Sequence, residues 1–248
     1  MKLCTIIPCR FNSTRFPGKP LEIIGKKPLM YYPYNEALKV KEIDSVFIAT
    51  DDERISKVCN ELKLNYIMTS KDHATGTDRV AEAYEIISKK KLFDMIINVQ
   101  GDEPFIKKEN IEDCINALKN KPEALAANGI SNLTSINDIT SHSSVKASIS
   151  KGKKLLYLTR SNIPYPNIRT ANIKYYKQLG LYAFRPKALE IFKNNEPSNL
   201  EKAEAVEILR LLENDVYVTT FVVDVEGPSV DTSNDLETVR TIYKNKPI

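Results

Sequence analysis

The chain has 248 residues, enough for one large domain or two small ones, and 42% of them are apolar, which is sufficient for a sizeable buried core. Lys and Arg number 36 and Asp and Glu 32, so the formal net charge is only +4, and the cations are spread along the chain. The absence of a basic tract argues against a nucleic-acid partner. Small local groups of Arg and Lys are still well suited to small anionic substrates.

The cysteine spacing and the N-terminal segment indicate in which cellular compartment the protein is expected. Four cysteines show neither CxxC nor Cys/His metal spacing, namely Cys4, Cys9, Cys59 and Cys114. Such a set predicts free, mostly buried thiols and a reducing, cytoplasmic environment. The apolar run before Arg10 is too short for a signal sequence or a membrane span, so we expect no targeting segment and no membrane association.

Short apolar runs alternate with longer amphipathic stretches in the first half of the chain. The expected strands are Leu3–Pro8, Ser45–Thr50, Asn65–Met68 and Asp94–Val99, and the expected helices are Leu29–Leu38, Glu53–Leu62, Thr77–Ser88 and Glu109–Leu118. This order predicts an α/β fold with a mostly parallel sheet and helices on both faces. Ligands in such folds lie in the loops at the carboxyl ends of the strands.

Beyond about Ala124 the pattern changes and predicts antiparallel strands. Antiparallel strands are expected at Val145–Ser150, Leu155–Thr159 and Leu179–Phe184, with a Pro-punctuated loop at Ile163–Ile168, and a further strand is expected at Tyr217–Val223. Helices are expected over Pro186–Asn194, Leu200–Glu213 and Ser233–Tyr243. No repeat or low-complexity stretch interrupts them.

The first expected strand runs into a loop, CRFNSTRFPGKPL, that carries Arg10, Arg15 and Lys19 among small residues such as Ser13 and Gly18. Small residues let backbone N–H groups approach phosphate oxygens, while Arg and Lys offset the charge of a leaving pyrophosphate. The loop lacks the Walker A spacing, so a solvated basic turn is the plainer alternative. Its position after the first strand favours phosphate binding.

Two acidic residues are candidate magnesium ligands. Asp102 follows the expected strand that ends at Val99, and Asp231 lies in the segment before the last expected helix. Magnesium prefers one or two carboxylates together with substrate phosphate oxygens. Asp231 could instead form a turn or cap the last helix, although Asp235 is better placed for that role.

Six stretches resemble, in order and spacing, the motifs of the CMP-Kdo synthetase family (Kdo is 3-deoxy-manno-octulosonic acid). They are Ile6–Leu21 (IIPCRFNSTRFPGKPL), Ile48–Arg54 (IATDDER), Met68–Val80 (MTSKDHATGTDRV), Asn98–Pro104 (NVQGDEP), Thr159–Tyr165 (TRSNIPY) and Val230–Leu236 (VDTSNDL). Each motif alone is modest, but the six together are highly specific. The resemblance implies a nucleotide-diphospho-sugar transferase-like fold, mostly parallel with a smaller antiparallel subregion. It also implies a nucleotidyltransferase that joins CMP from CTP to Kdo or a related sugar acid and releases pyrophosphate.

The resemblance assigns roles to individual residues. Arg10, Lys19 and Asp102 would be catalytic, and Asp102 and Asp231 would bind Mg2+. The residues expected along CTP are Arg10, Ser13, Arg15, Lys19, Gly76, Thr77, Arg79 and Gln100. The residues expected at the acceptor sugar are Gln100, Arg160, Gln178, Tyr182, Glu207 and Ile208. Arg160 would pair with the substrate carboxylate, although a structural ion pair would place an arginine there equally well.

The family also implies a single domain over residues 1–248 that forms a homodimer and serves lipopolysaccharide biosynthesis. Residues 1–123 would mainly bind the nucleotide, and 124–248 would mainly bind the acceptor and form the dimer. The acceptor half departs from the family pattern, because Gln178 and Ile208 stand where a histidine and a glutamine are usual, and the segment Ser141–Lys146 lacks a usual Pro-Asn. A cytidylyltransferase for a different sugar acid therefore stays open, as does a nucleotide-sensing module without activity. The two histidines, His73 and His142, are expected to be structural or solvent-facing.

Overall fold

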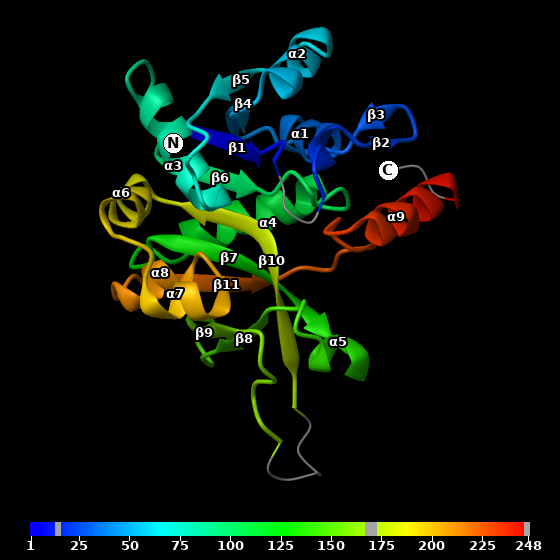
Figure 1. Ribbon diagram of the computed structural model, residues 1–248. Helices are drawn as coiled ribbons and strands as arrows, with labels where there is room; N and C mark the ends of the chain where they lie inside the picture. Colours follow the sequence, from blue (N-terminus) through cyan, green and yellow to red (C-terminus); the bar gives the residue numbers. More distant parts are fainter. Residues whose placement is uncertain (13–15, 167–172, 246–248) are drawn as a thin grey trace. The chain divides into compact units, whose positions relative to one another are not determined.

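The computed structural model describes residues 1–12, 16–166 and 173–245, and its helices and strands are shown in Figure 1. The chain forms two compact units, one of Met1–Glu112 with Val225–Ile248 and the other of Asp113–Asp224. The segment from Val225 onward therefore belongs with the N-terminal residues, and the expected division of roles between 1–123 and 124–248 stays a prediction. Hydrogen bonds and apolar packing, described below, join this segment to residues of the first unit.

The first unit contains a parallel sheet with the strand order β6-β1-β4-β5. Its strands are β1 (Leu3–Cys9), β4 (Ile43–Thr50), β5 (Tyr66–Met68) and β6 (Met95–Val99). β1 pairs in parallel with both β4 and β6, and β4 pairs in parallel with β5. All seven residues of β1 are buried, as expected for a strand covered on both faces.

The helices of the first unit alternate with these strands as the sequence predicts. They are α1 (Tyr31–Leu38), α2 (Glu53–Glu61), α3 (Gly76–Ser88), the start of α4 (Lys108–Lys119) and α9 (Ser233–Asn245). Two of them begin at recognisable caps. The Asp52 side chain accepts a hydrogen bond from Arg54 N at α2, and Thr75 and Asp78 form a capping box at α3. The predicted α/β fold with a mostly parallel sheet is confirmed.

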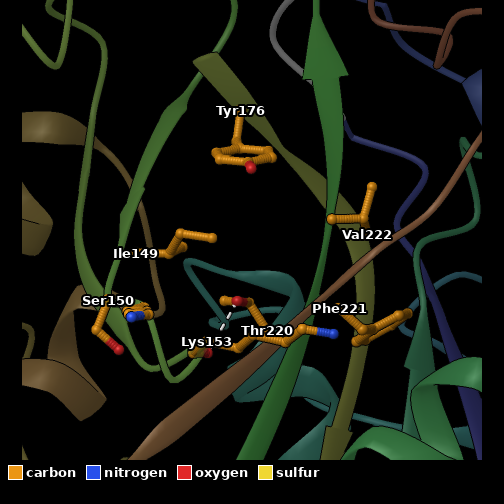
Figure 2. A pocket seen from close by; sticks show the side chains of 8 residues that line it. Ile149, Ser150, Lys153, Tyr176, Thr220, Phe221 and Val222 are labelled. Atoms are coloured by element: carbon orange, nitrogen blue, oxygen red, sulfur yellow. Dashed lines mark hydrogen bonds between the residues drawn. The ribbon is translucent and has the colours of Figure 1, made fainter. Parts of the chain in front are cut away.

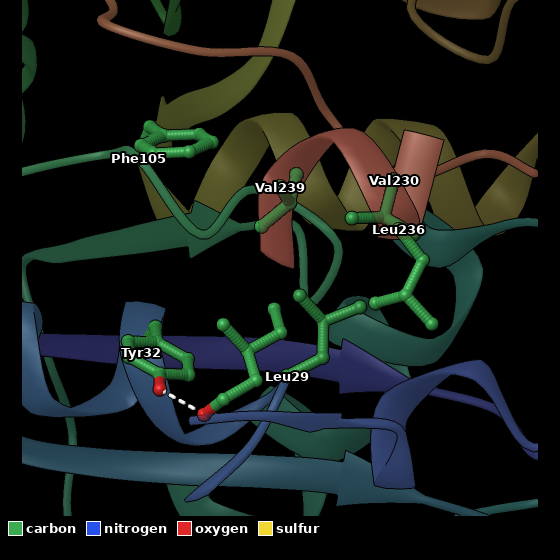
Figure 3. Packing of buried hydrophobic residues seen from close by; sticks show 7 residues of the cluster. Leu29, Tyr32, Phe105, Val230, Leu236 and Val239 are labelled. Carbon is green, nitrogen blue, oxygen red and sulfur yellow. Dashed lines mark hydrogen bonds between the residues drawn. The ribbon is translucent and has the colours of Figure 1, made fainter. Parts of the chain in front are cut away.

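The segment between β1 and α1 forms small elements that the sequence did not predict. They are a 3₁₀ helix at Lys19–Leu21 and a two-stranded antiparallel sheet of β2 (Ile23–Ile24) and β3 (Lys27–Pro28). Ile24 of β2 and Leu29, which follows β3, join a core cluster with the C-terminal segment, shown in Figure 3. The cluster consists of Ile24, Leu29, Tyr32, Phe105, Val230, Leu236 and Val239. It places Val230 and α9 in the first unit.

The second unit is built on β7 (Ala126–Leu133), which pairs with β10 (Tyr175–Phe184) in antiparallel and with β11 (Val218–Val222) in parallel. β8 (Lys146–Ile149) pairs in antiparallel with both β10 and β9 (Leu155–Thr159). The predicted change to antiparallel pairing is confirmed, but β7 itself was missed. Its Asn128-Gly129 pair is typical of a turn, yet Asn128 is fully buried and donates to the carbonyls of Leu179 and Leu181.

Helices α5 (Ile136–Thr140), α6 (Pro186–Asn194), α7 (Asn199–Glu204) and α8 (Leu209–Glu213) complete the second unit. The prediction of one helix over Leu200–Glu213 is wrong, because the chain breaks at Ala205, which has a φ of 52°. Arg210 of α8 bridges the break with two hydrogen bonds to the buried Glu201 carboxylate, at 2.7 and 2.6 Å. In the described part of the chain, no helix combines the length and apolar character that crossing a bilayer requires.

Candidate functional site

The predicted phosphate loop and the first candidate metal ligand follow two neighbouring strands of the first unit. Arg10 comes directly after β1, and Gln100, Gly101 and Asp102 come directly after β6. Because β1 and β6 are parallel, their carboxyl ends meet at one edge of the sheet. Gly101 permits this approach, since a Cβ there would lie 2.6 Å from Cys9 Sγ and 3.1 Å from the Pro8 carbonyl oxygen.

Lys19 lies between the two candidate metal ligands. Its Nζ is 2.5 Å from Asp102 Oδ2 and 3.9 Å from Asp231 Oδ1, and it donates to the Val230 carbonyl at 2.8 Å. The Lys19 side chain is 14% exposed, against 26% for Asp102 and 40% for Asp231. Three side chains from distant parts of the sequence, all predicted to act on the triphosphate or its metal, therefore lie together in the first unit.

The main chain holds the two carboxylates near each other. Val230 N donates to the Asp102 carbonyl at 2.9 Å, and Asp231 N donates to Asp235 Oδ2 at 3.0 Å. Asp235 also accepts from Thr232 N, while Asp235 N donates to Thr232 Oγ1, which is a capping box at the start of α9. The prediction that Asp235 is the capping acid is confirmed, and the Asp231 side chain is not needed for that role.

The residues around Lys19 Nζ fit a magnesium ion by the chemistry of their donors. Two carboxylates and a carbonyl already surround a positive charge there. Within the described residues, no group of three or more His, Cys, Asp or Glu is placed to hold a metal. Two carboxylates, completed by phosphate oxygens and water, match the usual demand of Mg2+ in a nucleotide site.

The ends of the phosphate loop are fixed, although its middle lies outside the described residues, and with it Ser13 and Arg15. Gly18 has a φ of 74° and donates from its N–H to the Phe11 carbonyl at 2.8 Å, which closes the loop. The Arg54 guanidinium lies 3.3 Å from the centre of the Phe11 ring and donates to both Asp52 carboxylate oxygens. Arg10 is exposed at the end of β1, where a ligand can reach it.

Three residues at the start of α3 are predicted to lie along the nucleotide, and they differ in accessibility. Gly76 faces Gln100, and a Cβ on Gly76 would lie 2.8 Å from Gln100 Nε2. Thr77 and Arg79 are buried instead, at 0% and 2% exposure. Arg79 donates to Thr69 Oγ1 at 2.6 Å and to Asp51 Oδ2 at 3.0 Å, so it ties together the segments that follow β4 and β5. Its predicted place along the nucleoside stays a prediction.

In the second unit, Arg160 is held by main-chain carbonyls. Its Nε donates to the Glu204 carbonyl at 2.7 Å and its Nη1 to the His142 carbonyl at 3.0 Å. The Glu204 carboxylate accepts from Arg160 N and Thr159 Oγ1. Burial acts to raise the pKa of Glu204, but these hydrogen bonds outweigh it and the pKa lies below its usual value. The Arg160 side chain is thus fixed in position by a structural network.

Lys146 is a further residue of this network, for which no role is predicted from the sequence. It is fully buried, and its ammonium donates to the carbonyls of Ser141, Ser144 and Arg160 at 2.7, 2.8 and 2.6 Å. Burial, reinforced by the nearby Arg160 charge, lowers the pKa of Lys146. The feature of the sequence that could have identified Lys146 is a lysine within an otherwise apolar strand pattern. Lys146 fixes the Arg160 main chain and so helps to orient that arginine.

The other predicted acceptor residues differ in accessibility. Ile208 is only 1% exposed, so it is a core residue of the second unit, and Tyr182 is 5% exposed and stacks on Phe184 with 5.9 Å between ring centres. Glu207, before α8, is partly exposed. Gln178 Nε2 is buried without a hydrogen-bond partner among the described residues. The expectation that both Gln178 and Ile208 face the acceptor stays a prediction, which is better supported for Gln178.

The histidines and cysteines offer little for catalysis. His73 Nε2 lies 2.5 Å from Glu82 Oε2, and His142 is exposed. The four cysteines are free and buried, as predicted. Burial raises the pKa of all four thiols, to about 12 for Cys4 and about 11 for Cys59. They are therefore poor sources of the thiolate that a nucleophile requires.

A cavity of about 370 Å3 in the second unit contains none of the predicted site residues. Figure 2 shows its lining and the hydrogen bond, 2.9 Å long, from Thr220 Oγ1 to the Lys153 carbonyl. The lining residues are Ile149, Ser150, Lys151, Lys153, Tyr176, Thr220, Phe221 and Val222. The chemistry predicted from the sequence thus lies elsewhere.

Comparison with known proteins identifies the family to which the chain is similar. A family model described as cytidylyltransferase matches residues 4–226. A 3-deoxy-manno-octulosonate cytidylyltransferase of Escherichia coli is 36% identical over 241 residues, which cover 97% of this chain and 96% of the relative. One of Flavobacterium johnsoniae is 34% identical over 247 residues, covering 99% of this chain and all of the relative.

Solved structures give the same result. A structure of CMP:2-keto-3-deoxy-manno-octonic acid synthetase complexed with CTP superposes with a TM-score of 0.91 at 35% identity, covering 99% of this chain and 100% of that one. The 4-diphosphocytidyl-2C-methyl-D-erythritol synthase of Anaerococcus prevotii has a TM-score of 0.64 at 16% identity, covering 98% of each chain. The second likeness is one of fold alone.

Proposed function

Because the chain belongs to the 3-deoxy-manno-octulosonate cytidylyltransferase family, we propose that it transfers CMP from CTP to Kdo or a related 2-ulosonic acid and releases pyrophosphate. The observation that carries the proposal is the cluster of Lys19, Asp102 and Asp231 at the edge of the sheet where β1 and β6 end. It offers a mobile cation for the phosphates and two carboxylates for a metal.

In this reaction the anomeric hydroxyl of the sugar acid attacks the α-phosphorus of CTP. The bond between the α-phosphorus and its bridging oxygen to the β-phosphate breaks, and pyrophosphate leaves in line with the attack. Arg10 and Lys19 would bind the leaving pyrophosphate and stabilise its charge. Asp102 and Asp231 would hold Mg2+, which withdraws charge from the phosphates and lowers the pKa of the attacking hydroxyl. No covalent enzyme intermediate is required.

A pyrophosphate-release assay with CTP, Mg2+ and candidate sugar acids tests this function. We expect release that depends on all three components. A nucleotide-sensing module without activity predicts nucleotide binding and no release. Such a module would be under no demand to keep Lys19, Asp102 and Asp231 together as they are here.

Arg10→Ala should lower kcat strongly while changing the affinity for cytidine little. Arg10 is exposed at the end of β1, and its charge is expected to act on the phosphates. Loss of one electrostatic donor of this kind costs roughly 2–4 kcal/mol of transition-state stabilisation. Steady-state kinetics with CTP measure the effect. Lys57→Ala, which removes an exposed cation from α2, is the matched control, and equal kcat values in the two variants would contradict the assignment.

The acceptor preference is a second prediction of the proposed function. Gln178 cannot become cationic and so lacks the charge-assisted contact that a protonated histidine would make with a sugar acid. We expect a related acid with a deoxy, amino or acylamino group, or a different chain length, to show a higher kcat/KM than Kdo. Competition among sugar acids in one CTP-dependent assay measures this. Clear preference for Kdo would show that the departure at Gln178 is neutral.

Gln178→His provides the reciprocal test of the acceptor preference. If the residue selects the acid, this substitution should shift the preference toward Kdo. Ile208→Gln is not an equivalent test, because Ile208 is 1% exposed and a buried amide without partners costs roughly 1–3 kcal/mol. Its expected effect is therefore on stability.

We also propose that the protein works as a homodimer in the cytoplasm and that its product serves lipopolysaccharide biosynthesis. The four free, buried thiols support a reducing compartment. Light scattering of the purified protein tests the dimer, which should appear at twice the chain mass of 28.1 kDa.

A further inference from the structure

The cavity in the second unit lies between the turn that joins β8 to β9 and residues of β10 and β11. Its volume of about 370 Å3 is within the range of about 300–1,000 Å3 that small-molecule sites occupy. We propose that this cavity binds a small phosphate monoester that carries an apolar group. The proposal does not depend on the proposed function, because the cavity contains none of the residues predicted to bind CTP or the acceptor.

The walls of the cavity are apolar. Tyr176 pairs with Ala147, so Ile149, two residues further along β8, lies on the same face of the sheet as Tyr176. Figure 2 shows the Tyr176 ring at one end of the cavity, with Ile149 and Val222 at its sides. Val222 is 44% exposed, so apolar surface remains uncovered there. A ring or short apolar chain of a ligand would cover it and could stack on Tyr176.

The turn supplies two cations, Lys151 and Lys153, and both line the cavity. None of the described lining residues is acidic, and in the part of the chain that the structure describes neither lysine side chain has a hydrogen-bond or ion-pair partner. Two positive charges without a counter-charge favour an anionic ligand. Lysine binds phosphate as a point charge, whereas paired recognition of a carboxylate is typical of arginine, which the described lining lacks.

The backbone of Lys153 gives an independent reason to assign its side chain a role. Ser150 N donates to the Lys154 carbonyl at 2.8 Å and Lys153 N to the Ser150 carbonyl at 2.9 Å, which closes a three-residue hairpin loop. Lys153, the last residue of that loop, has a φ of 67°, where glycine is favoured. Its carbonyl accepts from Thr220 N and Oγ1, and glycine would provide the same carbonyl. The lysine side chain is therefore not required by the turn.

Hydroxyl groups at the cavity add donors for phosphate oxygens. Ser150 Oγ accepts from Lys154 N at 3.0 Å, so its hydrogen is available to a ligand. The Tyr176 hydroxyl has no hydrogen-bond partner among the described residues. Thr220 Oγ1, by contrast, donates to the Lys153 carbonyl and can only accept further bonds. Two ammonium groups and two hydroxyl groups match the charge and the three acceptor oxygens of a phosphate monoester.

Titration with phenyl phosphate, followed by ligand-observed NMR, measures the Kd in the wild-type chain, in Lys153→Gly and in Lys151→Ala. We expect each substitution to weaken binding about tenfold, through loss of one charge-assisted contact. Because glycine suits a φ of 67°, Lys153→Gly should melt no lower than wild type, so loss of the turn cannot explain weaker binding. Lys187→Ala is the matched control, since Lys187 is an exposed lysine of the same unit on α6 and does not line the cavity.

Two further probes separate the parts of the ligand. Benzyl alcohol, a ring without charge, and inorganic phosphate, a charge without a ring, should each bind about tenfold more weakly than phenyl phosphate. Val222→Glu, which places an acid in the wall, should abolish phenyl phosphate binding, whereas Arg10→Ala in the phosphate loop should not change it. Wild-type affinity in both lysine variants, inorganic phosphate that binds as tightly as phenyl phosphate, or a loss seen only in Arg10→Ala would each overturn the proposal.

Discussion

Asp102→Asn and Asp231→Asn should each lower magnesium-dependent turnover by a factor on the order of 10³, since a metal supplies several kcal/mol of transition-state stabilisation. Asn keeps the volume of Asp but loses the charge that a magnesium ligand needs. Steady-state kinetics over a range of Mg2+ concentrations measure the effect. Activity like that of the parent in either variant would remove that residue from the metal site.

Thermal melting distinguishes a metal ligand from a structural acid. Asp102 and Asp231 are partly exposed, so loss of their attraction to Lys19 should change the free energy of unfolding by no more than about 1 kcal/mol. Asp235→Ala is the matched control, because Asp235 lies four residues from Asp231 and caps α9. It should lower stability by roughly 0.5–2 kcal/mol while turnover by the folded fraction persists.

The parallel part of the fold could be predicted because each strand and helix carries its own pattern. The mostly apolar run of β1 and the capping residues Thr75 and Asp78 of α3 are examples. β7 could not be predicted in this way. Asn128 and Gly129 favour a turn locally, and the carbonyls that accept from the buried Asn128 Nδ2, those of Leu179 and Leu181, lie far along the chain. Tertiary contacts thus override the local preference.

The break between α7 and α8 was missed for a similar reason. The residues from Leu200 to Glu213 are good helix formers, and Ala205, where the chain breaks, has the highest intrinsic helix propensity of all residues. Its left-handed conformation is held by the surrounding contacts, because Arg160 donates to the Glu204 carbonyl and Arg210 pairs with Glu201 across the break. Neither contact has a local sequence signal.

The part of the candidate site that directly follows strands could be predicted from the sequence. Asp102 follows β6 and Arg10 follows β1, so sequence order alone placed them at one edge of the sheet. Strand order does not show that Asp231 approaches them, because its segment returns to the first unit from the far end of the chain. The bond from Lys19 to Asp102 was not anticipated, since Lys19 was expected to contact phosphates only.

Arg210→Met should destabilise the second unit by roughly 3–5 kcal/mol, because it leaves the Glu201 carboxylate buried without its charged partner. The two side chains are 3% and 6% exposed, and Arg210 also donates to the Phe192 carbonyl at 3.1 Å. Chemical denaturation measures the loss. Lys187→Ala, which breaks an exposed pair with Glu190 on α6, should cost less than about 1 kcal/mol.

The double variant Arg210→Met with Glu201→Leu identifies the origin of that loss. If the cost comes from an uncompensated buried charge, replacement of both partners by apolar side chains should recover much of the stability lost in the single variant. The recovery will be incomplete, because Glu201 also accepts a hydrogen bond from Ser198 N in the capping box of α7. A double variant less stable than Arg210→Met alone would show instead that Glu201 acts mainly through the cap. The segment between α7 and α8, which carries Glu207, would then be stabilised more by the cap of α7 than by the ion pair.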